Sequence, residues 1–183
     1  FKVYVKYNAK AGRWYTKKDE KDAPEFEVTD LTAIFDMENI KTGWILFPPN
    51  GAPIKHWDPS LYQEAPCPGE GFKRGFQVDL YSEKNLLGVR EFCSTAGVVI
   101  TAMNALHTDW EATKDANPGK VPVIKCNGVV ELKNKHGSNY EPQLQIVKWV
   151  DRPDVFDAPA QQAAPPAKAP EPAAASADDD VEF

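Results

Sequence analysis

The stretch STAGVVITAMNALHTDWEATKD, residues 94–115, is the one clear helix signal in this sequence, and it organises the fold prediction. Its larger apolar residues recur at the spacing that places them on one helical face. Ser94 or Thr95 is expected to cap the N-terminus, and Asn117-Pro118-Gly119 is expected to end the helix. The residues of the apolar face are Val98, Val99, Met103, Leu106 and Trp110.

Short β-type segments lie on both sides of this helix. Before it they cover residues 1–7, 26–37, 44–47, 76–81 and 87–92, and after it residues 121–126, 129–133 and 143–150. Residues 17–24, 52–75 and 135–142 read as loops, and residues 82–85 as a turn. Asn127-Gly128 predicts either a hairpin turn or a β-bulge between the two segments that flank it.

Strands, one helix, then strands is the element order of an OB-fold, a five-stranded Greek-key barrel with one helix. The predicted fold is therefore mostly β, with strands one to three from residues 26–92 and strands four and five from residues 121–150. Other α+β folds share this order. We assign residues 1–157 to this OB-type domain.

The C-terminal part of the chain has a different composition. Residues 158–177 are almost wholly Ala, Pro and Gln and predict a flexible linker. The last residues, Asp178-Asp179-Asp180-Val181-Glu182-Phe183, form an acidic segment tipped by an aromatic ring. Such a segment suits capture by an apolar pocket with a cationic rim, although like-charged termini also serve simply as solubilising tails.

This tail resembles the C-terminus of single-stranded DNA-binding proteins of bacteria and phages. Asp178 to Asp180 and Phe183 match the Asp-rich, Phe-ended pattern, whereas Glu182 stands where the bacterial proteins usually have Pro. The tail therefore looks more like the phage type. The resemblance covers about 26 residues. It implies single-stranded DNA binding in replication, repair and recombination, with the tail recruiting replication and recombination proteins.

The charge of the chain is unevenly distributed. The formal net charge is −6, of which the segment from Ala158 onward carries −4, leaving −2 for the rest. An acidic chain argues against nucleic-acid binding, but a nearly neutral body can still present a basic face.

Aromatic and basic residues are interleaved at several places, as in proteins that stack bases and track phosphates. Trp14 and Tyr15 have an alternative role as anchors of the N-terminal strand, and a core role is favoured for Trp44 and Trp110. The predicted DNA-binding residues are Lys10, Arg13, Trp14, Tyr15, Lys55, Trp57, Tyr62, Phe72, Lys73, Arg74, Lys133 and Lys135.

Catalytic and metal-binding patterns are weak in this sequence, and no enzyme activity, metal or cofactor is predicted. Cys93 could pair with His56, His107 or His136 as a nucleophile and base, but a structural role is favoured. A zinc site would have to use Cys67, Cys93 and Cys126, which lack the close spacing of zinc ligands. Three separated cysteines also argue against a disulfide framework and favour a reducing cytoplasm, the host cytoplasm for a phage protein.

Three functional hypotheses follow. The first is a non-enzymatic single-stranded DNA-binding protein without strong sequence specificity, with its homo-oligomeric or cooperative state left open and no membrane partner. The second is a protein-interaction adaptor without DNA binding, in which the predicted cations scatter over the surface. The third is an enzyme of unknown class that uses residues 52–75 as a lid.

Overall fold

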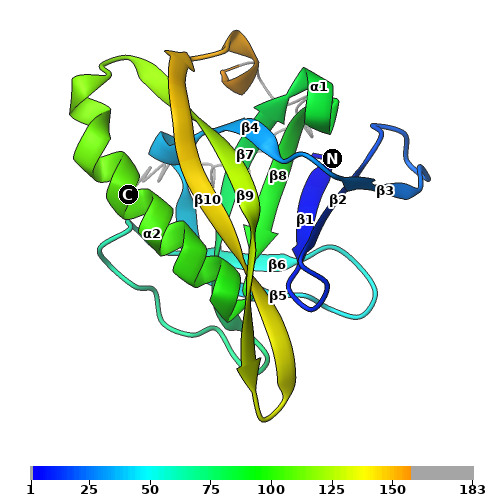
Figure 1. Ribbon diagram of the computed structural model, residues 1–183. Helices are drawn as coiled ribbons and strands as arrows, with labels where there is room; N and C mark the ends of the chain where they lie inside the picture. The colour runs from blue at the N-terminus through cyan, green and yellow to red at the C-terminus, as the bar shows by residue number, and fades with distance from the viewer. Residues whose placement is uncertain (1, 158–183) are drawn as a thin grey trace, which may run out of the picture.

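The computed structural model describes residues 2–157, which form a mostly β fold (Figure 1). The tail predictions for residues 158–183 lie outside the described residues. Ten strands form one mixed sheet, in place of the five strands expected. The strands are β1 (Tyr4–Asn8), β2 (Arg13–Lys17), β3 (Glu25–Val28), β4 (Thr32–Phe35), β5 (Lys41–Leu46), β6 (Ile54–Trp57), β7 (Lys73–Ser82), β8 (Gly88–Ser94), β9 (Lys120–Asn134) and β10 (Gly137–Asp151).

Two α-helices and three short 3-10 turns complete the described part of the chain. The helices are α1 (Glu83–Leu86) and α2 (Gly97–Thr113), and the turns cover Met37–Asn39, Lys114–Ala116 and Asp154–Phe156. No helix within residues 2–157 has the length and apolar character needed to cross a membrane.

The sheet is open and its strand order is β10-β9-β4-β7-β8-β1-β2-β3. Neighbouring strands are antiparallel except β1 and β8, which run parallel. Strand β5 pairs with both β6 and β7 beside this order. Strand β10, at one end of this order, contacts β1 and the turn that follows β1. The Tyr140 amide donates to the Ala9 carbonyl at 2.8 Å, and the Tyr7 hydroxyl donates to the Tyr140 carbonyl at 2.5 Å.

Helix α2 packs on one face of this sheet against β10, and it runs beside that strand in Figure 1. Its buried residues Val99, Met103, Leu106 and Trp110 join a core with Phe76, Val78, Leu80, Phe92 and Ile124 from the strands. The predicted helix is thus confirmed. Its predicted side-chain cap is wrong: Ala96 is the N-cap, because Ser94 still belongs to β8, and the Ser94 hydroxyl instead accepts a hydrogen bond from the Ala96 amide.

Several predicted boundaries differ from the structure. Residues 26–37 form two strands, because β3 pairs with β2 whereas β4 pairs with β7 and β9. The predicted loop of residues 52–75 contains β6 and the start of β7, and the predicted turn of residues 82–85 is mostly α1. Strand β6 lies close to β5, because Gly43 leaves room: a Cβ there would lie 2.3 Å from the His56 carbonyl oxygen.

The segment after α2 is a single long hairpin. Residues 121–126 and 129–133 belong to one strand, β9, and the predicted loop of residues 135–142 is mostly β10. Asn127 and Gly128 together face Gln143 of β10, so the bulge interpretation is correct and the turn interpretation is wrong. Gly128 has a φ of +107°, which suits glycine. The outer half of this hairpin projects beyond the body as an arm (Figure 1).

Candidate functional site

The sheet face that points away from α2 carries a mixture of rings and cations. Side chains alternate between the two faces of a strand, so burial of Val5, Trp14 and Thr16 on the core side turns their neighbours outward. We call this surface the outer face. Its residues on β1, β2, β5 and β6 are Tyr4, Lys6, Arg13, Tyr15, Lys41, Lys55 and Trp57.

Cations and rings lie against each other on the outer face. The Lys6 ammonium lies 5.9 Å from the centre of the Tyr15 ring. The ammonium groups of Lys41 and Lys55 lie 5.9 and 6.0 Å from the Trp57 ring. These distances are within the range of cation–π attraction. Each ring therefore lies beside an ammonium group that can bind an anion.

A groove of about 720 Å³ joins the two ends of the outer face. Its walls include Lys2, Tyr4, Lys6, Phe47, Pro53 and Lys55. The Phe47 ring is 49% exposed, which is unusual for a large apolar side chain. The groove therefore offers an exposed ring and three ammonium groups in one concave surface.

Most cations of the outer face are paired with carboxylates. Lys2 bonds Asp79 at 2.7 Å, Lys6 bonds Glu25 at 2.7 Å, and Lys55 is ion-paired with Glu91. Arg13 lies 3.8 Å from Glu27. The outer face is therefore nearly balanced in charge. An anion that binds its cations has to displace these carboxylates.

The carboxylate of Glu25 is the most connected of these acids. Burial disfavours its charged form, but hydrogen bonds from Lys6 and Tyr4 outweigh burial, and the pKa of Glu25 lies below its ordinary value. The Tyr4 hydroxyl donates to Glu25 at 2.6 Å, and burial together with this bond raises the pKa of Tyr4 to about 12. Glu25 is thus charged, and Tyr4 neutral, at neutral pH.

The opposite face of β5, β6 and β7 carries a second row, formed by His56, Trp44 and Arg74. Trp44 pairs with His56 on one side and with Arg74 on the other, so the three side chains lie across adjacent strands. The Arg74 guanidinium lies 5.2 Å from the Trp44 ring. Phe72 packs edge-on against His56, with ring centres 5.5 Å apart.

Asp58 anchors the loop that follows β6. Its carboxylate is ion-paired with Arg74, accepts from the Thr42 hydroxyl at 2.7 Å and accepts from the Ala65 amide at 2.9 Å. The Trp44 indole donates to the Ala65 carbonyl at 2.7 Å. Hydrogen bonding from Arg74 holds the pKa of Asp58 well below its ordinary value although the side chain is only 3% exposed.

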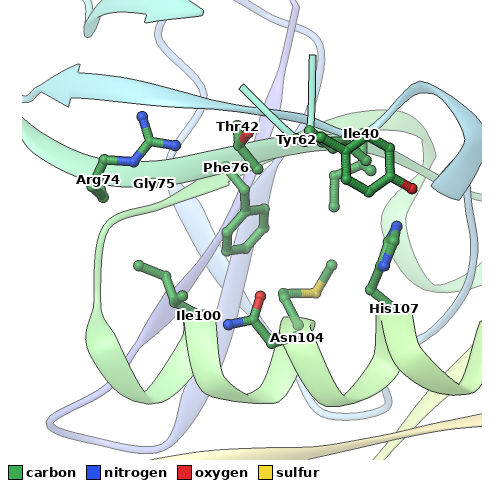
Figure 2. Close-up of a pocket in the computed structure, with 11 residues that line it drawn as sticks. Ile40, Thr42, Tyr62, Arg74, Gly75, Phe76, Ile100, Asn104 and His107 are labelled. Carbon is green, nitrogen blue, oxygen red and sulfur yellow. The ribbon is translucent and has the colours of Figure 1, made fainter. Parts of the chain in front are cut away.

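This anchored loop forms one wall of a pocket of about 330 Å³ between α2 and the strands (Figure 2). Phe76, Ile100 and Met103 supply apolar walls, while Asn104 and His107 of α2 supply polar groups. Tyr62 lies at the same pocket and is 90% exposed.

The predicted DNA-binding residues do not gather in one place. Arg13, Tyr15, Lys55 and Trp57 share the outer face, and Phe72, Arg74 and Tyr62 lie at the opposite row and pocket. Lys10 is exposed in the β1–β2 turn and Lys73 is exposed at the start of β7. Lys133 and Lys135 lie toward the end of the projecting arm.

The prediction that Trp14 binds DNA is corrected by its burial. Trp14 is only 4% exposed and packs between Tyr7 and Phe92, with ring centres 4.8 and 5.0 Å away. It therefore fills the core and leaves no face for a base, as the strand-anchor alternative expected. Of the two core predictions, Trp110 is buried, whereas Trp44 is only partly buried.

Several outer-face residues were missing from the predicted site: Lys2, Tyr4, Lys6, Lys41 and Phe47. Tyr4 and Lys6 could have been found from the two-residue period of residues 3–7, which separates them from Val3 and Val5. Lys41 and Phe47 carry no comparable local signal, because their position depends on the pairing of β5 with β6 and β7.

Cys93 lies on β8 at the groove and is partly buried. Burial raises the pKa of its thiol to about 11, so the thiolate needed for nucleophilic chemistry is scarce at neutral pH. Residues 2–157 contain no cluster of three or more His, Cys, Asp or Glu side chains placed to hold a metal ion.

No protein-family model matches the chain, and neither curated proteins nor solved structures give a significant match.

Proposed function

We propose that this protein binds single-stranded DNA without strong sequence specificity, through the outer face, in DNA replication, repair and recombination. The observation that carries the proposal is the alternation of cations and rings on one sheet face, with Lys6 against Tyr15 and Lys41 and Lys55 against Trp57. Bases of every type have faces that stack on aromatic rings, while ammonium groups bind the phosphates. This combination favours single strands over sequence-specific duplex recognition.

The strand connections support an OB-type interpretation of the domain. Strands β4 and β5 together occupy the place of the first OB strand, followed by β7 and β8, then α2, then β9 and β10. The pairings of β4 with β7 and β9, of β7 with β8, and of β9 with β10 agree with that interpretation. In this proposal β1, β2 and β3 are an N-terminal addition that widens the outer face.

The acidic segment from Asp178 to Phe183 completes the proposal by recruiting replication and recombination proteins. A tethered polyanion also competes with DNA for the lysines of the outer face. Removing it is therefore expected to strengthen DNA binding. The resemblance of this segment to phage-type single-stranded DNA-binding proteins supports this part.

A labelled dT oligonucleotide, titrated with the full chain and with a chain ending at Pro159, tests the proposal by fluorescence anisotropy. Binding that weakens as salt rises and strengthens on truncation is the expected result. No binding by either form at low salt would overturn the DNA-binding proposal. Weaker binding after truncation would overturn the competing role of the tail.

One observation favours a second candidate function, a protein-interaction adaptor. The predicted cations do not line one groove: Lys10 lies in the β1–β2 turn, Lys73 at the start of β7 on the side opposite to Arg74, Arg74 in the opposite row, and Lys133 and Lys135 on the arm. An adaptor would show no oligonucleotide binding while the tail retained its partner proteins.

A further inference from the structure

The pocket between α2 and the strands has two kinds of lining that suit different parts of one ligand. Its walls from Phe76, Ile100 and Met103 are apolar, and its floor carries the Asn104 amide and the His107 imidazole. Figure 2 shows both polar side chains rising from α2, with the His107 ring directed toward Tyr62. A flat ring with polar atoms along one edge matches this arrangement.

The two polar groups of the floor have unused hydrogen-bonding capacity. The Nε2 atom of His107 is buried, and no group within residues 2–157 forms a hydrogen bond with it; the Glu111 Oε1 atom lies 3.8 Å away. Asn104 likewise makes no side-chain hydrogen bond in the described part of the chain. A purely apolar occupant, such as a leucine or phenylalanine side chain, would leave the buried Nε2 atom of His107 unsatisfied.

The row formed by His56, Trp44 and Arg74 leads to this pocket. Arg74 belongs to both the row and the pocket lining. Strand β6 pairs only with β5 among the described strands, and it carries Trp57 on the outer face and His56 on the other. Single-stranded DNA that passes around the β6 edge of the sheet would meet rings and cations on both of its faces.

We propose that the pocket accepts one unstacked nucleobase of bound single-stranded DNA, with Asn104 and His107 contacting the polar edge of the base and Tyr62 stacking at the mouth. This inference rests on the proposed function. The volume of about 330 Å³ accommodates a single base with solvent, and it excludes a stack of several bases.

Chemical-shift mapping of the full chain with dT15 tests the inference. We expect shifts at residues 100–107 of α2 together with shifts on β1 and β2. A 15-unit abasic sugar–phosphate strand should move the β1 and β2 signals and leave residues 100–107 in place, because it has no base to insert. Shifts at residues 100–107 from the abasic strand, or none there from dT15, would overturn the proposal.

The variant Asn104→Leu provides a second measurement, because Asn104 is exposed on α2 and leucine favours helix formation. It should weaken dT15 binding about three- to tenfold, the loss expected for one or two hydrogen bonds. The matched control Thr108→Ala, on the same helix outside the pocket, should bind within about twofold of the parent chain. Equal affinity of Asn104→Leu and the parent chain would overturn the pocket assignment.

The outcomes separate the two proposals. If dT15 binds and moves β1 and β2 but the pocket signals and the Asn104→Leu affinity do not change, only the pocket inference fails. If dT15 does not bind at all, the proposed function fails and the pocket inference fails with it. If a peptide of the sequence DDDVEF moves residues 100–107 and dT15 does not, the pocket is a peptide site and the base proposal is wrong.

Discussion

The Arg90 guanidinium donates a hydrogen bond from Nε to the Thr16 hydroxyl at 3.0 Å, although the Arg90 side chain is only 1% exposed. The Thr16 hydroxyl in turn donates to the Tyr4 carbonyl at 2.8 Å. Two further Arg90 bonds reach the carbonyls of Lys17 and Val89. This chain of bonds ties β8 to β2 and β1, and so it holds the N-terminal part of the outer face against the core.

Arg90→Lys is expected to destabilise the fold. Lysine keeps the charge but cannot reproduce the forked donors, so buried acceptors on β2 and β8 lose their partners at a cost of about 2–3 kcal/mol. Urea unfolding measures the change. The exposed control Arg13→Lys should stay within about 0.5 kcal/mol of the parent chain, and an equal effect of both substitutions would contradict the role given to Arg90.

Asp58→Asn is expected to lower the free energy of unfolding by about 3 kcal/mol, because the amide cannot replace a charged partner of Arg74. The pH dependence has a definite sign. The pKa of Asp58 is lowered in the folded chain, so its contribution is present above the unfolded pKa of about 4 and is lost as pH falls toward the folded pKa. Thermal unfolding from pH 7 to pH 2 checks this.

The control for this prediction compares the parent protein with the Asp58→Asn variant at low pH. The difference in stability between the parent chain and Asp58→Asn should shrink as the pH falls below about 4, because the Asp58 carboxyl then begins to protonate in the unfolded chain while it stays charged in the folded chain. A difference that stays constant down to pH 2 would show that Asp58 acts by packing and not by charge.

Glu91→Gln is expected to strengthen binding of a dT oligonucleotide several-fold at low salt. Loss of this carboxylate frees the Lys55 ammonium, which is ion-paired with it, for a phosphate. The matched control is Glu38→Gln, which removes the same charge from an exposed position in the Met37–Asn39 turn. If both variants gain equally, net charge alone explains the effect.

Tyr15→Ala is expected to weaken oligonucleotide binding about tenfold, because one stacked base contributes about 1–3 kcal/mol. Tyr15→Phe keeps the ring and should bind within about twofold of the parent chain. Anisotropy titrations at one fixed salt concentration compare the three proteins. Weak binding by Tyr15→Phe as well would assign the role of Tyr15 to its hydroxyl and not to stacking.

Helix α2 could be predicted from the sequence alone, because a period of 3.6 residues over four turns is a local signal. The sequence also indicated most of the β-segments, and at Asn127-Gly128 it left a hairpin turn and a bulge open, between which strand pairing decided. It did not determine the role of Trp14, whose aromatic–basic surroundings suggested DNA binding although the ring is buried against Tyr7 and Phe92. The residues next to Trp14 in the sequence show only the local composition. Burial of a side chain depends on which face of the strand it occupies and on which strands pair with that strand.

Which rings and cations share a surface depends on the packed fold and could not be predicted from the sequence. Lys41 and Trp57 are 16 positions apart and become neighbours because Gly43 allows β6 to lie close to β5. Asp58 and Arg74 meet across a loop whose sequence predicts no pairing. Such contacts depend on strand register and close backbone approach, which are properties of the packed sheet and leave little trace in local sequence.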